Sequence, residues 1–173
     1  MIKLVNFAEE DYETLISWID TEDLLMQFAG PGFRFPLTKE QLAESASDPS
    51  RFSFTIVDTI SKERIGHCEV LITDTTAKIG RVIIGSEQAK GKGYCGEIMR
   101  KLVEFIYSRI DRTIIELNVF DFNRVAISCY EKVGFRINPD LKFERKVRDE
   151  TWIALNMILD HEVFHKAAHA DVK

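Results

Sequence analysis

The chain has 173 residues, 45% of them hydrophobic, which suits one domain with its own core. Its net charge is −5 and its basic residues are dispersed, so it lacks the positive patch typical of proteins that bind nucleic acid or anionic membranes. No run approaches the roughly 18 apolar residues of a membrane span, and the N-terminus has no signal-peptide pattern, so we expect a cytoplasmic protein.

The first elements are a strand, two helical segments and a loop. We expect the strand over residues 2–7, an acidic amphipathic helix over 9–19 and a short helical segment over 21–28. Residues 29–37, AGPGFRFPL, are punctuated by glycine and proline, which predicts a loop.

A further helix and a three-stranded meander follow. Thr38, with Gln41 three residues later, has the spacing of a capping box and predicts a helix start. Residues 51–60 alternate apolar and polar side chains, which predicts a half-buried strand, and 65–73 and 78–84 continue the meander. A glycine inside each of the last two strands indicates a bulge or a close backbone approach.

Residues 82–110 have the order strand, glycine loop, helix. The β-branched run Val82–Ile84 ends at Gly85, and the loop QAKGKG follows at Gln88–Gly93. Apolar residues then recur at helical spacing up to residue 110.

Glycines in such a loop let the backbone approach a ligand, and the helix start offers unpaired N–H groups. Gly91 and Gly93 are placed for this, and Lys90 and Lys92 add positive charge, so the segment is suited to a phosphate group. A plain strand-to-helix connection with solvated lysines is the alternative.

Another strand is expected over 113–119, followed by a loop, a short helix and a Gly-Phe turn. Residues 138–149 are charged and contain Pro139, and alternation predicts a final strand over 150–159. The cysteines are three in number, without CxxC spacing, so we expect free thiols in a reducing compartment.

The loop QAKGKG resembles the Gln/Arg-x-x-Gly-x-Gly/Ala signature of the GNAT (Gcn5-related) N-acetyltransferases, which bind the pyrophosphate of acetyl-coenzyme A there. The patterns GxxxxGK[ST] and GxGxxG of other phosphate loops are missing. Six further positions match the family in order: Asn118, Asn123, Ala126, Tyr130, Gly134 and Phe135.

The resemblance implies an α/β (α+β) fold: a mixed, mostly antiparallel sheet of six to seven strands, with helices on both faces and strands splayed at the acetyl-coenzyme A site. We expect one domain over residues 1–173, with a helical tail over 160–173. Its implied contacts with acetyl-coenzyme A are Ile83, Ile84, Gly85, Gln88, Ala89, Lys90, Gly91, Lys92, Gly93, Tyr94, Cys95, Asn118, Asn123, Ala126, Tyr130 and Lys132.

The family also suggests roles in proton transfer. Tyr130 stands where relatives place the general acid that protonates the leaving thiolate, although a tyrosine packed against the sheet is the alternative. Ile84 is the expected backbone donor to the acetyl carbonyl. Glu69 is the candidate general base, and His67, on the same face of its strand by alternation, is the other candidate.

The acceptor is expected near the first helices and the glycine-proline loop, with Phe28, Phe33, Arg34 and Phe35 as substrate contacts or as caps of the core. The implied reaction is transfer of an acetyl group to a primary amine of a small molecule or of a peptide or protein N-terminus. An acidic chain is compatible with a cationic amine. A non-catalytic acyl-coenzyme A sensor on the same fold is the alternative. We expect a monomer or homodimer without nucleic-acid or membrane partners.

A second motif lies at residues 161–165, HEVFH, which matches the HExxH of zinc hydrolases. It stands so close to the C-terminus that no segment remains for a substrate cleft and a further ligand. We therefore expect no catalytic metal, although a loose surface metal site that includes His169 is an alternative.

Overall fold

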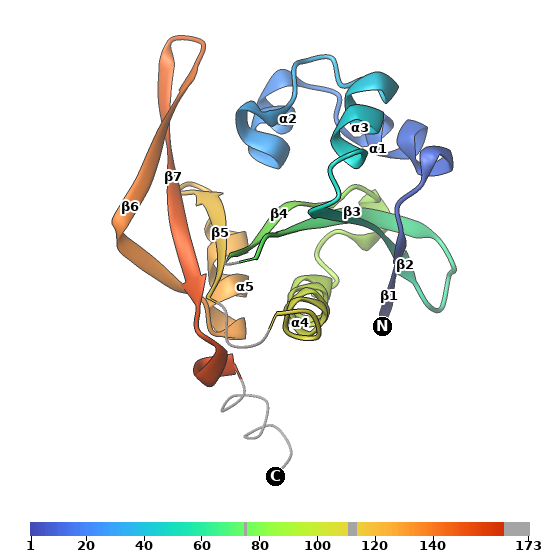
Figure 1. Cartoon of the computed structure of the whole chain (residues 1–173). Coiled ribbons are helices and arrows are strands. Elements are labelled where there is room, and N and C mark those ends of the chain that lie inside the picture. The colour runs from blue at the N-terminus through green and yellow to red at the C-terminus, as the bar shows by residue number, and fades with distance from the viewer. Residues whose placement is uncertain (75, 111–113, 165–173) are drawn as a thin grey trace.

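The computed structural model describes residues 1–74, 76–110 and 114–164, and it folds around a seven-stranded sheet. Three helices cover one face of the sheet and two cover the other, while the last two strands form a hairpin that extends beside α2 (Figure 1). The strands are β1 (Ile2–Asn6), β2 (Arg51–Asp58), β3 (Arg64–Ile72), β4 (Ala77–Ile84), β5 (Ile115–Phe120), β6 (Arg136–Val147) and β7 (Glu150–Leu159). The helices are α1 (Tyr12–Trp18), α2 (Glu22–Ala29), α3 (Lys39–Ala46), α4 (Tyr94–Tyr107) and α5 (Arg124–Val133).

The strand order is β1-β2-β3-β4-β5-β7-β6, and the expected mixed, mostly antiparallel sheet is confirmed. Among the described strands, only β4 and β5 pair in parallel, and their register covers three residue pairs, from Ala77 opposite Ile115 to Ile79 opposite Leu117. Beyond Ile79 the two strands separate. The sheet is therefore open at its centre, where the sequence predicted splayed strands.

Strand β4 carries the expected bulge at the point where it leaves β5. In the pairing of β3 with β4, His67 stands opposite Ile83 and Glu69 stands opposite Gly80. The two residues of β4 between Gly80 and Ile83 therefore have no partner on β3. One of these two residues is Arg81, which has a positive φ of 50°. At Gly66, a side chain would collide with the carbonyl of Ile83, so this glycine serves a close approach of two strands.

Two apolar clusters hold the layers together. The larger lies between the sheet and the helices α4 and α5, and the inward face of α4 contributes Ile98, Met99, Leu102, Val103 and Ile106, each at most 1% exposed. The smaller joins α1, α2 and α3 through residues such as Leu15, Leu25 and Leu42. The amphipathic pattern predicted for α4 is confirmed, because one face of the helix is buried and the other is not.

Strand β6 occupies the charged segment that contains Pro139. A proline cannot donate a hydrogen bond to a neighbouring strand, so it is tolerated at an edge or a bulge. Here β6 is the edge strand, and its register with β7 is irregular between Ile137 and Lys142, around the proline. No helix in the described part of the chain is long and apolar enough to cross a membrane. The tail from residue 165 onward, with His165 and His169, lies outside the described residues.

The prediction of three free thiols is wrong. Cys95 near the start of α4 and Cys129 on α5 form a disulfide, and their Cα atoms lie 6.4 Å apart. Only Cys68, buried in the sheet, remains a thiol. A separation of 34 residues gives no spacing signal, because the two helices come together only through the fold. The cysteines consequently give no support to a reducing compartment.

We expect a thiol titration of the denatured, unreduced protein to find one reactive cysteine, and reduction to lower the free energy of unfolding. A cross-link over a 34-residue separation restricts the unfolded chain by roughly 3–4 kcal/mol in the chain-entropy description. The urea midpoint with and without dithiothreitol measures this effect, and Cys129→Ser is the control, since reduction should leave its midpoint unchanged. Three titratable thiols in the unreduced wild type would contradict the pairing.

Candidate active site

The site lies where β4 and β5 separate, and it consists of two adjoining pockets. The smaller, of about 60 Å³, is lined by Val82 on β4, Leu117 on β5, and Asn123 and Tyr130 around α5. The larger, of about 360 Å³, is lined by α2, the following loop and residues from six strands. Both pockets share lining residues from α2, β4 and β5, so the opening in the sheet connects the side of α5 with the side of α2.

The glycine loop precedes α4 in the conformation that its sequence suggested. Gly91 and Gly93 have φ values of +75° and +78°, which glycine adopts without strain. A Cβ at either position would meet no atom of the described chain within 4 Å, so the backbone is open to an approaching group. Gly93 is the N-cap of α4, and no side chain caps the helix within the described residues. This arrangement fits a diphosphate bound by N–H groups.

The side chains around this loop are largely engaged with the protein. The Tyr94 hydroxyl donates to Asp58, Lys90 pairs with Glu87, and the buried Ala89 packs into the core. The side chains of Tyr94 and Cys95 are thus bonded to Asp58 and Cys129, and their expected contact with acetyl-coenzyme A stays a prediction, as does that of Ala89. Gln88 approaches Ser86, with 3.1 Å between Gln88 Oε1 and Ser86 Oγ.

Ile83, Ile84 and Gly85, at the end of β4, lie outside the two pockets. Ile83 and Ile84 pair with His67 and Gly66 of β3. The N–H of Gly85 donates to the carbonyl of Ile65 (3.0 Å), and a side chain there would collide with the ring of Trp18. The Gly85 amide is therefore already used within the protein. The β4 residues that face the smaller pocket are Ile79, Gly80, Arg81 and Val82.

Helix α5 brings Tyr130 to the smaller pocket. The side-chain oxygen of Asn123 accepts a hydrogen bond from the N–H of Ala126 (3.2 Å), so Asn123 caps the helix. The half-buried hydroxyl of Tyr130 makes no hydrogen bond within the described residues, and burial raises its pKa to about 12. The hydroxyl is therefore protonated at neutral pH. Lys132, two residues further along α5, is exposed and lines neither pocket.

Asn118 lies on β5 between the pockets and the neighbouring strand β7. Its side-chain amide lies 3.0 Å from the Nδ2 of the fully buried Asn156, which also donates to Glu116 (2.9 Å). Asn118 lines both pockets, so it joins the strands and faces the opening at the same time.

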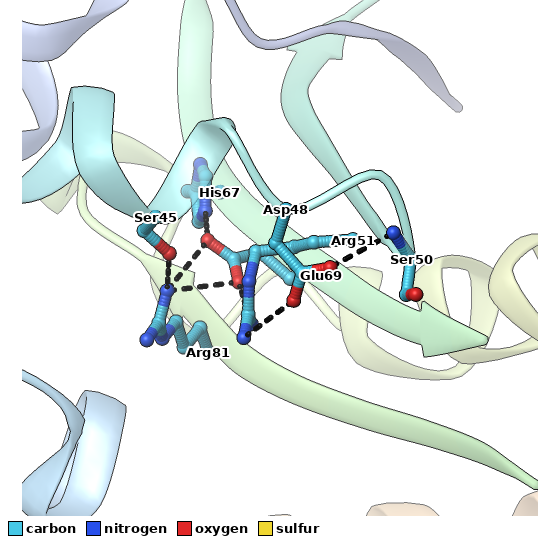
Figure 2. A network of polar contacts seen from close by, with 7 residues as sticks. All are labelled: Ser45, Asp48, Ser50, Arg51, His67, Glu69 and Arg81. Atoms are coloured by element: carbon cyan, nitrogen blue, oxygen red, sulfur yellow. Dashed lines mark hydrogen bonds and ion pairs between the residues drawn. The ribbon is translucent and has the colours of Figure 1, made fainter. Parts of the chain in front are cut away.

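A network of charged side chains surrounds Glu69 on the floor of the larger pocket (Figure 2). Its carboxylate accepts from Arg51 (2.9 Å), from Arg81 (3.1 Å) and from the Nε2 of His67 (3.1 Å). Arg81 also donates to Ser45 (2.6 Å). The His67 ring is 1% exposed and packs edge-on against Phe7, which accounts for its position behind the carboxylate.

The surroundings of Glu69 argue against its expected role as general base. Burial alone would raise the pKa of this carboxyl, but the hydrogen bond from His67 and the charge of Arg81 outweigh burial, and Arg51 adds to them. The resulting pKa is about 2, so the carboxylate is a very weak proton acceptor. His67, the other candidate, is buried and lines neither pocket.

The four residues expected to contact the acceptor have different positions. Phe28 lines both pockets. Phe33 packs against Arg81, whose guanidinium carbon lies 3.9 Å from the centre of the Phe33 ring. Arg34 exchanges hydrogen bonds with the side chain of Gln41, which holds the loop against α3. Phe35 is 45% exposed and lines neither pocket. Thr38 caps α3 as predicted, but Gln41 reaches back to the loop rather than to Thr38.

The charged lining of the larger pocket was not predicted. Arg51, Lys78, Arg81 and Arg145 all line it, from three different strands. Alternation along β2 and β3 could have suggested that Arg51 and Glu69 share a face. The contribution of Arg145 depends on the β6–β7 hairpin, for which the sequence offered no partner.

Comparisons with known proteins agree with this geometry. A family model described as "Acetyltransferase (GNAT) domain" matches residues 2–136. Spermidine N-acetyltransferase from Vibrio cholerae, solved with coenzyme A and spermine, has the same fold, with 19% identity, a TM-score of 0.78, and coverage of 95% of this chain and 98% of that one. An aminoglycoside acetyltransferase solved with coenzyme A has 20% identity, a TM-score of 0.72, and coverage of 96% and 98%.

The match to the family model covers most of the chain and includes the glycine loop, the strand opening and Tyr130. It agrees with a loop that can bind a diphosphate and with an opening that can admit a thioester. The chain belongs to the GNAT acetyltransferase family, and it is an acyltransferase that uses acetyl-coenzyme A as its co-substrate.

Proposed function

We propose that this protein transfers the acetyl group of acetyl-coenzyme A directly to a primary amine of a small molecule or of a peptide N-terminus. The observation that carries the proposal is the pair of adjoining pockets at the opening between β4 and β5. One pocket holds Tyr130 and the other is wide enough for an acceptor. The similar folds solved with spermine and with kanamycin support an amine, because both compounds are amines.

The cofactor end uses the loop before α4. Backbone N–H groups around Gly91 and Gly93 bind the diphosphate, and Lys92 adds positive charge nearby. Acetyl-coenzyme A supplies the activated acetyl group as a thioester. The thioester arm enters the opening of the sheet, where the bulged backbone from Gly80 to Val82 offers donors to the acetyl carbonyl in place of the expected Ile84.

Tyr130 acts on the leaving group. The amine nitrogen bonds to the carbonyl carbon, the carbon–sulfur bond breaks, and the thiolate takes the proton of the Tyr130 hydroxyl. The amine nitrogen releases one proton to solvent as the amide forms, and Tyr130 takes one proton back from solvent, which restores its hydroxyl. Glu69 remains an anion between Arg51 and Arg81, and its role is to position them.

A thiol-release assay tests the proposal. Purified protein is incubated with acetyl-coenzyme A and a panel of amino acids, peptides, polyamines and aminoglycosides, and free coenzyme A is measured. Saturable turnover with an amine is the expected result. Tight coenzyme A binding without turnover on any amine would favour the alternative of a non-catalytic sensor.

Tyr130→Phe should lower kcat by roughly 100-fold, in the usual range for loss of a general acid, while KM for acetyl-coenzyme A changes little. The comparison with an acetyl thioester of a more acidic thiol is decisive. Such a leaving group needs less protonation, so the variant should recover most of its rate. Tyr107→Phe on α4, outside both pockets, is the control. An equal loss with both thioesters would assign Tyr130 to packing.

Glu69→Gln should destabilise the fold at neutral pH by roughly 2–4 kcal/mol, because two arginines lose their shared counter-charge. The folded pKa of about 2 lies below the ordinary value of 4.5, so the contribution of Glu69 is complete above pH 4.5 and is lost as the pH falls toward 2.

Urea unfolding at several pH values measures the difference between wild type and Glu69→Gln, which should shrink below pH 4.5 by at most about 1.4 kcal/mol per pH unit. Asp58, whose carboxyl also has a pKa of about 2, is present in both proteins, so its contribution to the pH dependence drops out of the difference. The exposed Glu104→Gln is the control. A difference that stays constant from pH 6 to pH 3 would show that Glu69 is not held by these partners.

A further inference from the structure

The larger pocket has a charge opposite to that of the whole chain. Four cationic side chains line it, and Glu69 is the one carboxylate among its described lining residues. The chain as a whole carries −5. The remaining lining, from α2, the loop after it and the strands, is neutral and includes Phe28 and Gly32. The pocket is therefore a local region of positive potential in an acidic protein.

Two of the four cations are already neutralised in part. Arg51 and Arg81 share the carboxylate of Glu69, and Asp48 lies 3.8 Å from Arg51. The carboxylate of Glu69 thus fixes both guanidinium groups in the lining of the larger pocket. These arginines are part of the frame of the pocket, and their remaining positive charge still acts on its contents.

Lys78 and Arg145 are the cations without such a partner. Within the described chain, neither has a carboxylate within 4.0 Å, whereas Arg148, three residues beyond Arg145, pairs with Asp23 on α2. The Lys78 ammonium lies 3.1 Å from the side-chain amide of Asn118. Arg145 is half-buried and donates to the backbone carbonyl of Glu144 (3.0 Å). Neither cation is thus held in an ion pair within the described chain, although Glu116 stands opposite Lys78 in the register of β4 and β5.

The position of these two cations gives the acceptor an orientation. Lys78 and Arg145 line the larger pocket but not the smaller pocket that contains Tyr130. Gly80 and Asn118 are among the residues that line both pockets. A molecule in the larger pocket can therefore direct its amine toward the opening of the sheet and a different group toward Lys78 and Arg145.

We propose that the acceptor is an amine that also carries an anionic group, a carboxylate or a phosphate, bound by Lys78 and Arg145. A guanidinium and an ammonium are the side chains best suited to such oxygens. Polyamines and aminoglycosides, by contrast, bring further positive charge into a pocket of the same sign. This proposal rests on the amine transfer proposed above, and it replaces the cationic acceptor that the overall acidity suggested.

Matched acceptors test the proposal. β-Alanine and propylamine differ by a carboxylate against a methyl group, and O-phosphoethanolamine and ethanolamine differ by a phosphate. We expect kcat/KM to be roughly tenfold or more higher for the anionic member of at least one pair, in line with loss of one charge-assisted contact. The pair with the larger ratio identifies the anion. A preference for the uncharged members or for spermidine would overturn the proposal.

Variants assign the preference to the two cations. Lys78→Met and Arg145→Met should each reduce the anionic-to-neutral ratio by roughly tenfold through KM of the acceptor. KM for the neutral amine should rise much less than KM for its anionic match. Lys146→Met, an exposed lysine next to Arg145 on the same strand, is the control. Ratios equal to wild type in both variants would overturn the proposal.

A binding measurement separates this proposal from the proposed reaction. Calorimetry with the protein saturated by coenzyme A reports whether the anionic acceptor binds more tightly than its neutral match. If no amine is turned over and the anionic preference in binding is lost in Lys78→Met, the reaction fails while the assignment of the pocket holds. If the affinities of matched compounds are equal, the assignment of the pocket fails whether or not acetyl transfer occurs.

Discussion

The separation of β4 from β5 is the constraint on which the site depends. Parallel strands need a crossover, and here the connection is the loop and helix that begin at the glycines, so one topological choice creates both the gap and the diphosphate loop beside it. Pairing over only three residue pairs leaves the backbone after Ile79 without a neighbouring strand. The bulge at Arg81 then turns this free backbone toward the opening.

The same bulge links the opening to the charge network. Arg81 sits in the bulge, and its guanidinium reaches Glu69 on β3, Ser45 on α3 and the ring of Phe33 in the loop after α2. One side chain thus connects the sheet, a helix and the loop that walls the acceptor pocket. A carboxylate held by two arginines is poorly suited to accept a proton, but it is well suited to fix them in place.

Local patterns in the sequence predicted most of the elements and the cofactor end of the site. The glycine loop and α4 are continuous in sequence, so spacing was sufficient to identify them. The disulfide between Cys95 and Cys129, the ion pairs of Glu69 and the position of Arg145 depend on contacts between distant segments. The pKa of Glu69 illustrates the difference: its residue type suggested a base, whereas its neighbours lower its pKa to about 2.

The two halves of the site also differ in what the family can explain. The glycine loop, the strand opening and Tyr130 all lie within the matched residues 2–136, so family membership accounts for the use of acetyl-coenzyme A. Arg145 and the hairpin of β6 and β7 lie almost entirely beyond that match. The hairpin lines the larger pocket through Arg145 and Ala154, so the anion site proposed above combines Arg145, outside the family match, with Lys78, inside it. On that proposal, the positive charge of the pocket is a better guide to the acceptor than the amines bound by proteins of similar fold.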